Sequence, residues 1–277
     1  MNKIIIMTMD IEPDIIQYLK DSYIGVEEGL PRFIKVLEGN KIKTDFFVTG
    51  DVCEKYPELV RRICDHGHNL GCHGYSHAVQ YYCQRKLDWQ YDDLSKATGI
   101  IEKTTRHRPV MFRAPNFSAN GDTIKALETL RYEIDSSVLP GRLVKKLRFW
   151  KVIDHREAPK EPYLPSKGRI TERGESNILE IPVTENPMQK GSPIGAGYLN
   201  LHGVEETIKA IQMVDSNHVL FLLHPWECIN LGEYHEELPQ WIKAICRENH
   251  RDIALLIEKL RASDFIFSSL ASLVPQP

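Results

Sequence analysis

The sequence predicts an α/β protein, a single distorted (β/α) barrel of seven or eight parallel strands over residues 1–277. Short apolar segments alternate with amphipathic helical patterns, and this alternation is typical of parallel strands joined by crossover helices. About eight such units fit into a chain of this length, which is the size of one barrel. The first strand has no Gly-rich phosphate loop after it, so an open doubly wound sheet is the second choice.

The expected strands are brief, apolar and often end at a polar residue or at Gly. They cover Ile4–Met9, Thr44–Thr49, Asn69–Cys72, Val110–Arg113, Tyr132–Asp135, Ile178–Val183, Val219–Leu223 and Phe265–Ser268. Helical patterns lie between most of them. The first helix is expected from Val26 to Leu37, with Gly39-Asn40 as its stop signal, and the second follows a capping box of Asp51 and Glu54 and ends near Gly67. Asn120 is the expected cap of a helix that continues to Leu130. The other expected helices cover Leu87–Arg106, Val204–Val214 and Arg251–Leu260.

One region, residues 141–177, breaks this rhythm with weak periodicity and several prolines. Between Arg142 and Arg173 it contains ten Lys or Arg against four Asp or Glu, a local excess of six positive charges. Because it follows the fifth expected strand, we expect this basic insertion to lie over the C-terminal face of the barrel. Two interpretations of this basic insertion remain open. It could favour an anionic substrate, such as a sugar carried on a diphosphate, or it could be a solvated lid.

Composition excludes several classes of protein. Apolar residues make up 42% and charged residues 26%, as in an ordinary globular protein, and the formal net charge of −3 argues against a nucleic-acid binder. No segment approaches the roughly 20 apolar residues that a membrane span needs. The N-terminus does not resemble a secretory signal, so a cytoplasmic location is expected. The six cysteines form no C-x-x-C pair and are expected to be reduced.

Ionisable and metal-binding side chains stand at the ends of five expected strands and are almost absent from the strand bodies. These segments are Asp10-Ile11-Glu12, His73-Gly74-Tyr75-Ser76-His77, Arg113-Ala114-Pro115-Asn116-Phe117, Asp135-Ser136-Ser137 and His224-Pro225-Trp226-Glu227. In a (β/α) barrel the active site lies at the C-terminal ends of the strands. The pattern therefore predicts one site at that face.

Two imidazoles and a carboxylate are the main candidates for a metal site. His73 and His77 are four apart and can share one ion where the chain turns like a helix, although two ordinary surface histidines would have the same spacing. A carboxylate from the first strand would leave open positions for water and substrate. Asp10 and Glu12 are two apart and point to the same side of an extended chain, so one could bind metal while the other accepts a proton from water.

Three more residues are candidates for catalysis. Arg113 could orient a carboxylate through a bidentate pair, or form a structural salt bridge. His224 emerges from a continuous apolar run typical of a buried strand and is well placed as an acid, unless it is a packed core histidine. Asp135 could hydrogen-bond His224 and keep it protonated. Trp226 either walls the pocket or packs under a loop.

The ordered motifs resemble those of the polysaccharide deacetylase family, the NodB-homology domains of carbohydrate esterase family 4. The resemblance runs from about Ile4 to Glu227 and rests on five segments, with Phe46-Phe47-Val48-Thr49-Gly50 as a further likeness. They are Thr8-Met9-Asp10-Ile11-Glu12, His73-Gly74-Tyr75-Ser76-His77, Arg113-Ala114-Pro115-Asn116-Phe117, Asp135-Ser136-Ser137 and Leu223-His224-Pro225-Trp226. Asp-Ile-Glu and Tyr-x-x-Asp-Ser-Ser are most similar to the branch associated with exopolysaccharide and exosortase gene sets.

The resemblance implies a distorted barrel and a metal-dependent hydrolase that removes acetyl groups from N-acetylated sugars. It implies one divalent ion, Zn before Co, Ni, Fe or Mn. By this resemblance, Glu12, His73 and His77 would bind the metal, Asp10 would be the general base and His224 the general acid. Arg113 would orient Asp10, Asp135 would tune His224, and the backbone N–H of Asn116 would donate to the oxyanion. The substrate would contact Tyr75, Phe117 and Trp226.

The sequence departs from the family pattern in two places. Ile11 separates two acids that are adjacent aspartates in most members, which leaves open whether Asp10 or Glu12 is the base. Arg113-Ala114-Pro115-Asn116 replaces a more usual Arg-Pro-Pro-Tyr. Two other functions remain as alternatives: an amidohydrolase that acts on a small cyclic amide, as in allantoinase-like relatives, and a non-catalytic carbohydrate-binding barrel.

Overall fold

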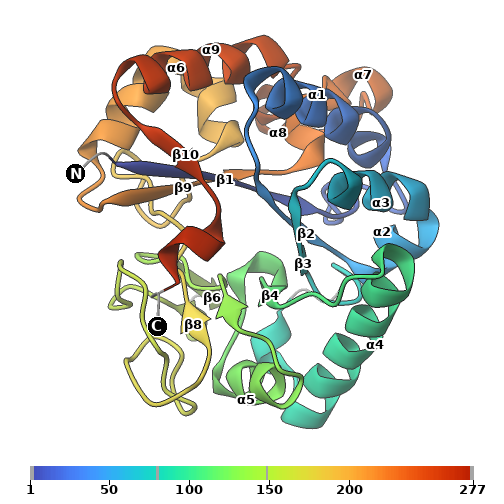
Figure 1. Ribbon diagram of the computed structural model, residues 1–277, viewed down its shortest axis with the longest axis vertical. Helices are drawn as coiled ribbons and strands as arrows, with labels where there is room; N and C mark the ends of the chain where they lie inside the picture. Colours follow the sequence, from blue (N-terminus) through green and yellow to red (C-terminus); the bar gives the residue numbers. More distant parts are fainter. Residues whose placement is uncertain (1–2, 79–80, 148, 275–277) are drawn as a thin grey trace.

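A computed structural model describes residues 3–78, 81–147 and 149–274 (Figure 1). Its main feature is one curled parallel sheet covered on the outside by helices. The strands of this sheet are β1 (Ile4–Ile11), β2 (Asp45–Val48), β3 (Asn69–Cys72), β4 (Met111–Phe112), β5 (Ile134–Asp135), β8 (Leu179–Glu180), β9 (His218–Leu223) and β10 (Ile266–Ser268). The α-helices are α1 (Leu30–Asn40), α2 (Gly50–Lys55), α3 (Pro57–Asp65), α4 (Leu87–Thr105), α5 (Gly121–Thr129), α6 (Ala196–Met213), α7 (Leu231–Tyr234), α8 (Gln240–Ile245) and α9 (His250–Ala262).

Strand β1 lies at the centre of the sheet. One of its edges pairs with β9 over residues 4–9. Its other edge pairs with β10 over residues 4–6 and then with β2 over residues 8–11. From β2 the sheet continues through β3, β4 and β5 to β8. Every pairing in this sheet is parallel, as the alternation of strand and helix predicts.

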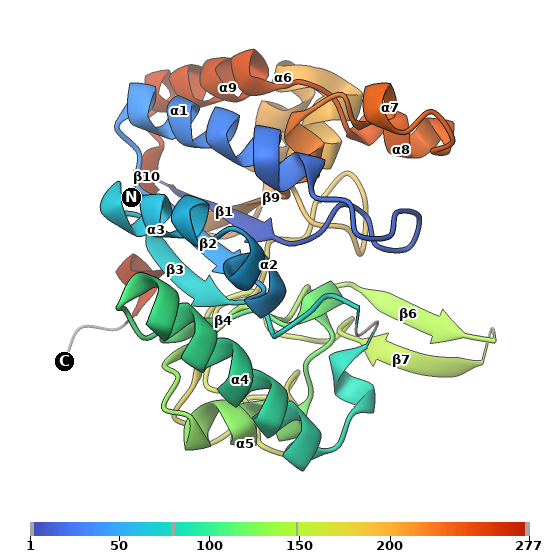
Figure 2. The same cartoon turned by 90° about the vertical axis from the view of Figure 1, so that its right-hand side faces the viewer.

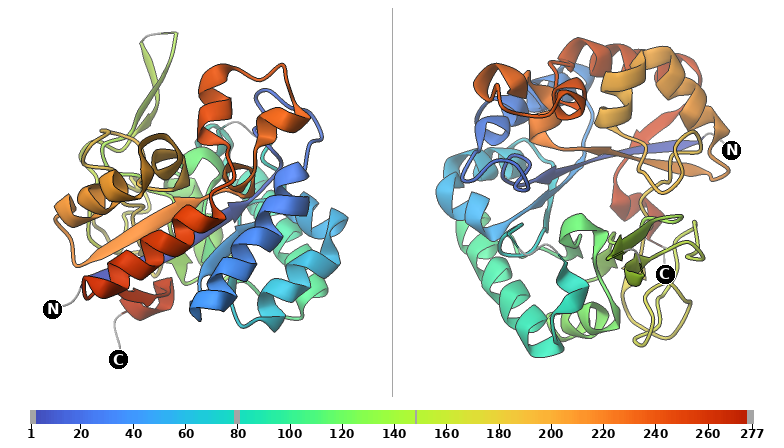
Figure 3. Two further views of the ribbon diagram at one scale, coloured as in Figure 1. Left: turned by 90° about the horizontal axis from the view of Figure 1, so that it is seen from above. Right: turned by 180° about the vertical axis from the view of Figure 1, so that it is seen from behind.

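The two ends of the curled sheet approach each other. The chain that leaves β8 forms a parallel bridge between Gly195 and Leu222 of β9, and Leu222 N donates to the carbonyl of Ile194. The predicted distorted barrel is thereby confirmed as a half-barrel whose strands curl around a common interior. The views from above and behind show helices α1, α6 and α9 on the outer side of β1, β9 and β10 (Figure 3).

Alternation along β1 sorts its side chains between the two sides of the sheet. Ile5, Met7, Met9 and Ile11 belong to the large core beneath the helices. Ile6 faces inward and packs with a second buried cluster. Because side chains two apart share a face, the inward series continues from Ile6 through residues 8, 10 and 12. The interior therefore changes from apolar to polar toward the C-terminal ends of the strands.

Most expected elements are confirmed, with boundaries shifted by a few residues. The cap at Asn120 is confirmed, because its side chain accepts hydrogen bonds from the backbone of Asp122 and Thr123. The capping box of Asp51 and Glu54 is wrong: the helix begins at Gly50, so Asp51 already lies inside it. The single helix expected there is two helices, because Pro57 begins a new one.

The basic insertion contains a hairpin that the weak periodicity did not predict. Strands β6 (Leu143–Lys146) and β7 (Trp150–Asp154) pair antiparallel and form a separate two-stranded sheet. In Figure 2 this hairpin projects from the side of the molecule toward which the strands of the main sheet point. The hairpin thus stands beside the C-terminal face, as expected, whereas Lys167 and Asn177 of the same insertion contact Glu128 near the C-terminal end of α5. Within the described residues, no helix has both the length and the apolar character to cross a membrane.

Closure of the half-barrel requires a glycine at position 195. A Cβ at Gly195 would lie 2.1 Å from the carbonyl oxygen of Leu222, so Gly195→Ala forces the two ends apart. We expect this variant to lose about 1–3 kcal/mol in the free energy of unfolding. The matched control is Gly39→Ala in α1, where no atom lies within 4 Å. That control should gain about 0.5–1 kcal/mol, and equal losses in both variants in urea unfolding would contradict the assigned closure.

Candidate active site

The site occupies the polar, C-terminal end of the curled sheet. Its lowest layer is Arg113, which follows β4 and is fully buried over the ring of Phe47. Above it lie Asp10 and then Glu12, which the alternation of β1 points inward. His73 and His77 follow β3, and His224 follows β9. The structure therefore brings together residues that are up to 214 positions apart in the sequence.

The carboxylate of Glu12 faces the imidazoles of His73 and His77. Its Oε2 atom is 3.3 Å from Nε2 of His73 and 3.0 Å from Nε2 of His77, and all three side chains are buried. Burial raises the pKa of Glu12, but the two histidines together hold it well below the usual range. Burial lowers the pKa of His77, and the charge of Glu12 outweighs this and raises it. In the absence of a cation, the charge of Glu12 favours a proton on the imidazole of His77.

The three side chains fit a metal ion. Among the described residues, Oε2 of Glu12 is buried without a properly directed hydrogen bond, although two nitrogens lie close to it. The three donor atoms all lie within 4.8 Å of one another. Two bonds of about 2.0–2.2 Å at a tetrahedral angle hold their donor atoms about 3.4 Å apart. Nδ1 of His73 bonds to the carbonyl of Arg113 at 2.7 Å, which leaves Nε2 of this ring available as a ligand.

Arg113 holds Asp10 beside this centre. Its Nη1 donates to Oδ1 of Asp10 at 2.7 Å and to Oγ1 of Thr8 at 3.0 Å. Its remaining donors reach the backbone carbonyl and the hydroxyl of Ser136, each at 3.0 Å. A buried guanidinium with this many partners is fixed in place, and it leaves Oδ2 of Asp10 as the oxygen that it does not contact.

His224 lies on the opposite side of Glu12 and is held by Glu227. Its Nδ1 is 3.0 Å from Oε2 of Glu227, which also accepts from the backbone N–H of His224, and its ring stacks on Trp226 at 4.5 Å. Its Nε2 is 3.9 Å from Oε1 of Glu12. Burial lowers the pKa of His224, but the carboxylates of Glu227, Glu12 and Asp10 outweigh it and raise the pKa to about 9.

The expected contact between Asp135 and His224 is wrong. Glu227 occupies that place, because it lies on the same short helical turn as His224, three residues further on. Asp135 pairs in register with Glu180 of β8 instead, and its Oδ1 accepts from the hydroxyl of Ser137. The spacing His-x-x-Glu, typical of a capping pair, was the signal for Glu227 that our sequence interpretation missed.

Asp135 and Glu180 form a fully buried pair of carboxyl groups on neighbouring strands. Oδ2 of Asp135 and Oε2 of Glu180 each lack a donor among the described residues, and the two side chains bond to each other when one is protonated. Burial raises the pKa of Asp135 to about 6, and burial with the nearby Asp135 charge raises that of Glu180 well above its usual value. The pair supports the loop after β5, since Val138 N donates to Glu180.

A cleft of about 280 Å³ opens over these groups and contains two of the three expected substrate contacts, Phe117 and Trp226, together with Asn116. Asn116 and Phe117 both adopt left-handed backbone angles, which turn the chain sharply after β4. Tyr75, the third expected contact, is not brought to the cleft. Its hydroxyl donates to Glu54 and its ring lies under Lys96, both on the outer helices.

The cleft includes two further side chains that sequence reasoning did not single out. Arg142, at the base of the β6–β7 hairpin, lies over the ring of Phe117, and its Nε is buried without a partner among the described residues. Trp241 of α8 is 59% exposed and meets Tyr18 edge to face. A second cavity of about 300 Å³ shares His224 and Trp241 with the first, so the two cavities adjoin and are together called the groove below.

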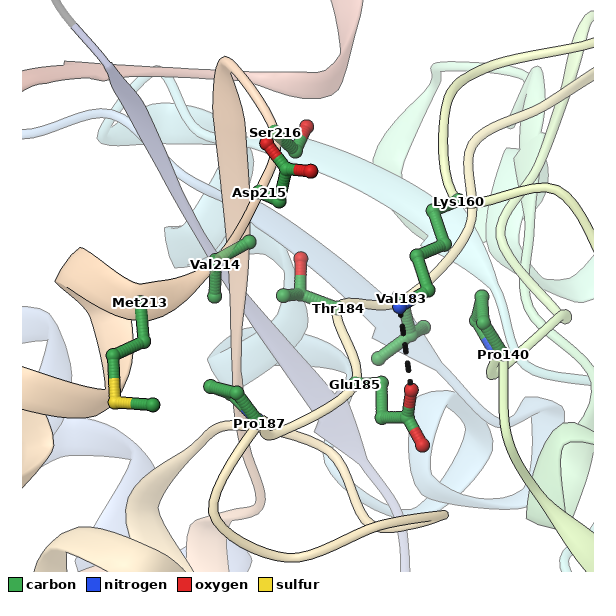
Figure 4. A pocket seen from close by; sticks show the side chains of 10 residues that line it. All are labelled: Pro140, Lys160, Val183, Thr184, Glu185, Pro187, Met213, Val214, Asp215 and Ser216. Carbon is green, nitrogen blue, oxygen red and sulfur yellow. Dashed lines mark ion pairs between the residues drawn. The ribbon is translucent and has the colours of Figure 1, made fainter.

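A smaller pocket of about 130 Å³ lies elsewhere, between the chain after β8 and the turn before β9 (Figure 4). Lys160 and Glu185 point toward each other across it, with their charged atoms 3.8 Å apart. Its lining, which is described in full, contains no histidine or cysteine. We therefore place the chemistry in the cleft around Glu12.

The fold and the site together define a curled α/β barrel with a His–His–carboxylate centre at its C-terminal face. Residues 2–134, just under half of the chain, match the polysaccharide deacetylase family. The match includes Asp10, Glu12, both histidines of the centre and Arg113. The resemblance seen in the sequence motifs is thereby confirmed at the level of the family.

Two curated relatives and one solved structure illustrate the similarity. The peptidoglycan deacetylase of Helicobacter pylori is 26% identical over 189 residues, 64% of this chain and 62% of the relative. The peptidoglycan deacetylase-like protein FGM2 of Gibberella zeae is 34% identical over 112 residues, 40% of this chain and 32% of the relative. The chain thus spans less than two thirds of these relatives. A family 4 acetyl xylan esterase from Clostridium thermocellum, in complex with cobalt, shares the fold with a TM-score of 0.55 at 16% identity, over 98% of this chain and 90% of the esterase.

The carboxyl pair predicts a pH-dependent difference in stability. The folded pair keeps a proton that an unfolded Asp and Glu release near pH 4, so its contribution to stability is present below that pH and is lost as pH rises through about 6 and beyond. Glu180→Gln replaces the shared proton by an amide donor. We expect the variant to gain stability relative to the unchanged protein from pH 5 to 8, by up to about 1.4 kcal/mol per pH unit.

Thermal unfolding across this pH range measures that difference. Glu172→Gln is the matched control, because Glu172 is an exposed acid paired with Arg169. A difference between Glu180→Gln and the unchanged protein that stays constant with pH would show that the pair holds no proton.

Proposed function

We propose that the protein is a metal-dependent hydrolase that removes acetyl groups from N-acetylated sugars, whether polysaccharide, oligosaccharide or a lipid- or nucleotide-linked sugar. The observation that carries this proposal is the placement of Oε2 of Glu12 between two imidazole nitrogens, with the Arg113–Asp10 pair directly beside it. Glu12, His73 and His77 would hold one divalent ion. When bound, the ion lowers the pKa of water and polarises the acetyl carbonyl.

In this mechanism Asp10 is the general base. Arg113 fixes one oxygen of the carboxylate and leaves the other for the proton of the attacking water. Glu12 is less suited to that role, because its Oε2 faces both histidines. The same geometry therefore favours Asp10 as base and Glu12 as ligand. The backbone N–H of Asn116, in the sharp turn that borders the cleft, is the donor proposed for the oxyanion.

His224 is the proposed general acid. The C–N bond of the amide breaks as Nε2 delivers a proton to the departing nitrogen, and the products are acetate and the free amino sugar. Glu227 positions the ring through Nδ1 and Trp226 through stacking, so the imidazole stays oriented toward the cleft. The raised pKa of His224 keeps it protonated near neutral pH.

The size of the groove favours a saccharide over a small cyclic amide. Its two adjoining cavities measure about 280 and 300 Å³, which together lie within the range of pockets for drug-sized ligands. Aromatic side chains line both. The cobalt bound by the esterase neighbour supports a divalent ion, and zinc is our first choice for two imidazoles and a carboxylate. The exopolysaccharide branch and a cytoplasmic location stay predictions.

Metal content tests the ligand set. Protein purified without added metal should contain close to one divalent ion per chain, His77→Ala should lose it, and the control His107→Ala should keep it because His107 is exposed. His77 must lose its proton to bind a cation, and its pKa is raised. We therefore expect zinc affinity to fall by about tenfold per pH unit on acidification. Stoichiometric metal in His77→Ala, measured by elemental analysis, would reject the assignment.

Acetate release tests the reaction. A panel of N-acetylated oligosaccharides, nucleotide sugars and cyclic amides separates the deacetylase from a cyclic amidohydrolase, and silence throughout with sugar binding intact would favour a binding barrel. Asp10→Asn should lower acetate release by about 10²–10⁴-fold while metal stays bound. Lys160→Gln, in the pocket of Figure 4, should leave the rate unchanged. Unaltered activity in Asp10→Asn would remove this residue from the mechanism.

A further inference from the structure

The tip of the β6–β7 hairpin presents large apolar side chains to solvent. Leu147 and Phe149 are 89% exposed and Trp150 is 73% exposed, the highest values among the exposed large apolar residues of the described chain. The two strands of the hairpin pair only with each other, and its tip projects away from the body of the protein (Figure 2). Nearer the base, Lys146 contacts Gln84 and the ring of Tyr81, and the carbonyl of Val152 accepts from Cys83. Three such residues together at one protrusion mark a surface that meets another apolar phase.

The same hairpin is strongly basic. Residues 142–151 contain five Lys or Arg and no Asp or Glu. Lys145 and Lys146 are exposed on β6 and lie opposite Lys151 and Trp150 of β7. Lys151 is paired with Asp154 nearer the base, so the uncompensated charge gathers toward the tip. An apolar tip with a Trp and a collar of lysines is the composition that anchors proteins at the interface of an anionic bilayer.

We propose that the β6–β7 hairpin docks the protein on an anionic lipid bilayer, with Leu147, Phe149 and Trp150 entering the headgroup region and Lys145 and Lys146 contacting lipid phosphates. A polysaccharide fits this surface less well, because Leu147 has no ring to stack on a sugar and a neutral glycan offers the lysines no charge. A second copy of this chain fits less well too, because its hairpin would bring the same positive charges together.

Docking here would place the cleft beside the membrane. Arg142 connects the hairpin with the cleft, since it directly precedes β6 and lines the cleft. The hairpin projects from the side toward which the strands of the main sheet point (Figure 2), and residues that follow those strands, such as Glu12 and His224, line the cleft. This consequence rests on the proposed function: the substrate would be an N-acetylated sugar presented at a lipid surface. Binding to vesicles is measured without any substrate, so the docking and the hydrolysis can fail separately.

Co-sedimentation of the full chain with vesicles tests the docking. We expect binding to phosphatidylcholine vesicles that contain one quarter phosphatidylglycerol, weak binding to phosphatidylcholine alone, and release at high salt. The triple variant Leu147→Ser, Phe149→Ser, Trp150→Ser should bind at least about tenfold more weakly. Lys145→Gln and Lys146→Gln should each weaken binding about fivefold. Leu255→Ser and Lys259→Gln on α9 are the controls, and they should bind like the unchanged protein.

Depth of insertion provides a second measurement that does not depend on a multiple variant. Trp150 fluorescence should shift to the blue on vesicle binding and be quenched by lipids brominated near the headgroup, and Trp150→Phe should remove most of this response. Absence of vesicle binding by the unchanged chain overturns the proposal. An equal loss of vesicle binding in the Leu255→Ser control overturns it as well. Dimerisation or glycan binding that depends on the hairpin, in the absence of vesicle binding, also overturns it.

Discussion

The buried ion pair between Arg113 and Asp10 is the contact on which the rest of the site depends. Arg113 bonds to Thr8 and Asp10 from β1 and to Ser136 after β5, and its own carbonyl accepts from the ring of His73. One residue therefore ties together the ends of four strands. A charge in this position is stable only because every partner is present, and removal of one partner would cost about 3–5 kcal/mol.

Above that pair, the charges are arranged around a single carboxylate. Glu12 is held ionised, while the pKa values of His77 and His224 are both raised. In the absence of a cation, protons on these imidazoles compensate the buried negative charge. A divalent ion held by Glu12, His73 and His77 would take over this compensation from the proton on His77. Since His224 does not share Oε2 of Glu12, it is free to keep its proton.

The sequence predicted the parts of the fold that depend on local pattern. Strand β3 was predicted to the residue, and the inward placement of Asp10 and Glu12 follows from alternation alone. Partners that depend on a neighbouring strand or turn could not be obtained in this way. The pairing of Asp135 with Glu180 depends on the register between β5 and β8, and the 43 intervening residues gave no periodic signal for it. The hairpin was hidden for a similar reason, because its exposed side chains do not alternate between apolar and polar.

The inward face of β1 explains how stability and chemistry are separated within one strand. Ile6 packs in a closed apolar layer with Phe47 and Leu220, so the lower half of the interior stabilises the sheet. From Thr8 onward each inward side chain is polar, and each is bound to a partner from another strand or faces the centre. Burial of the apolar layer lowers the local dielectric constant and so strengthens the contact between Arg113 and Asp10 above it. The polar end of β1 can therefore hold two carboxylates within a few residues of each other, one fixed by Arg113 and the other by two histidines.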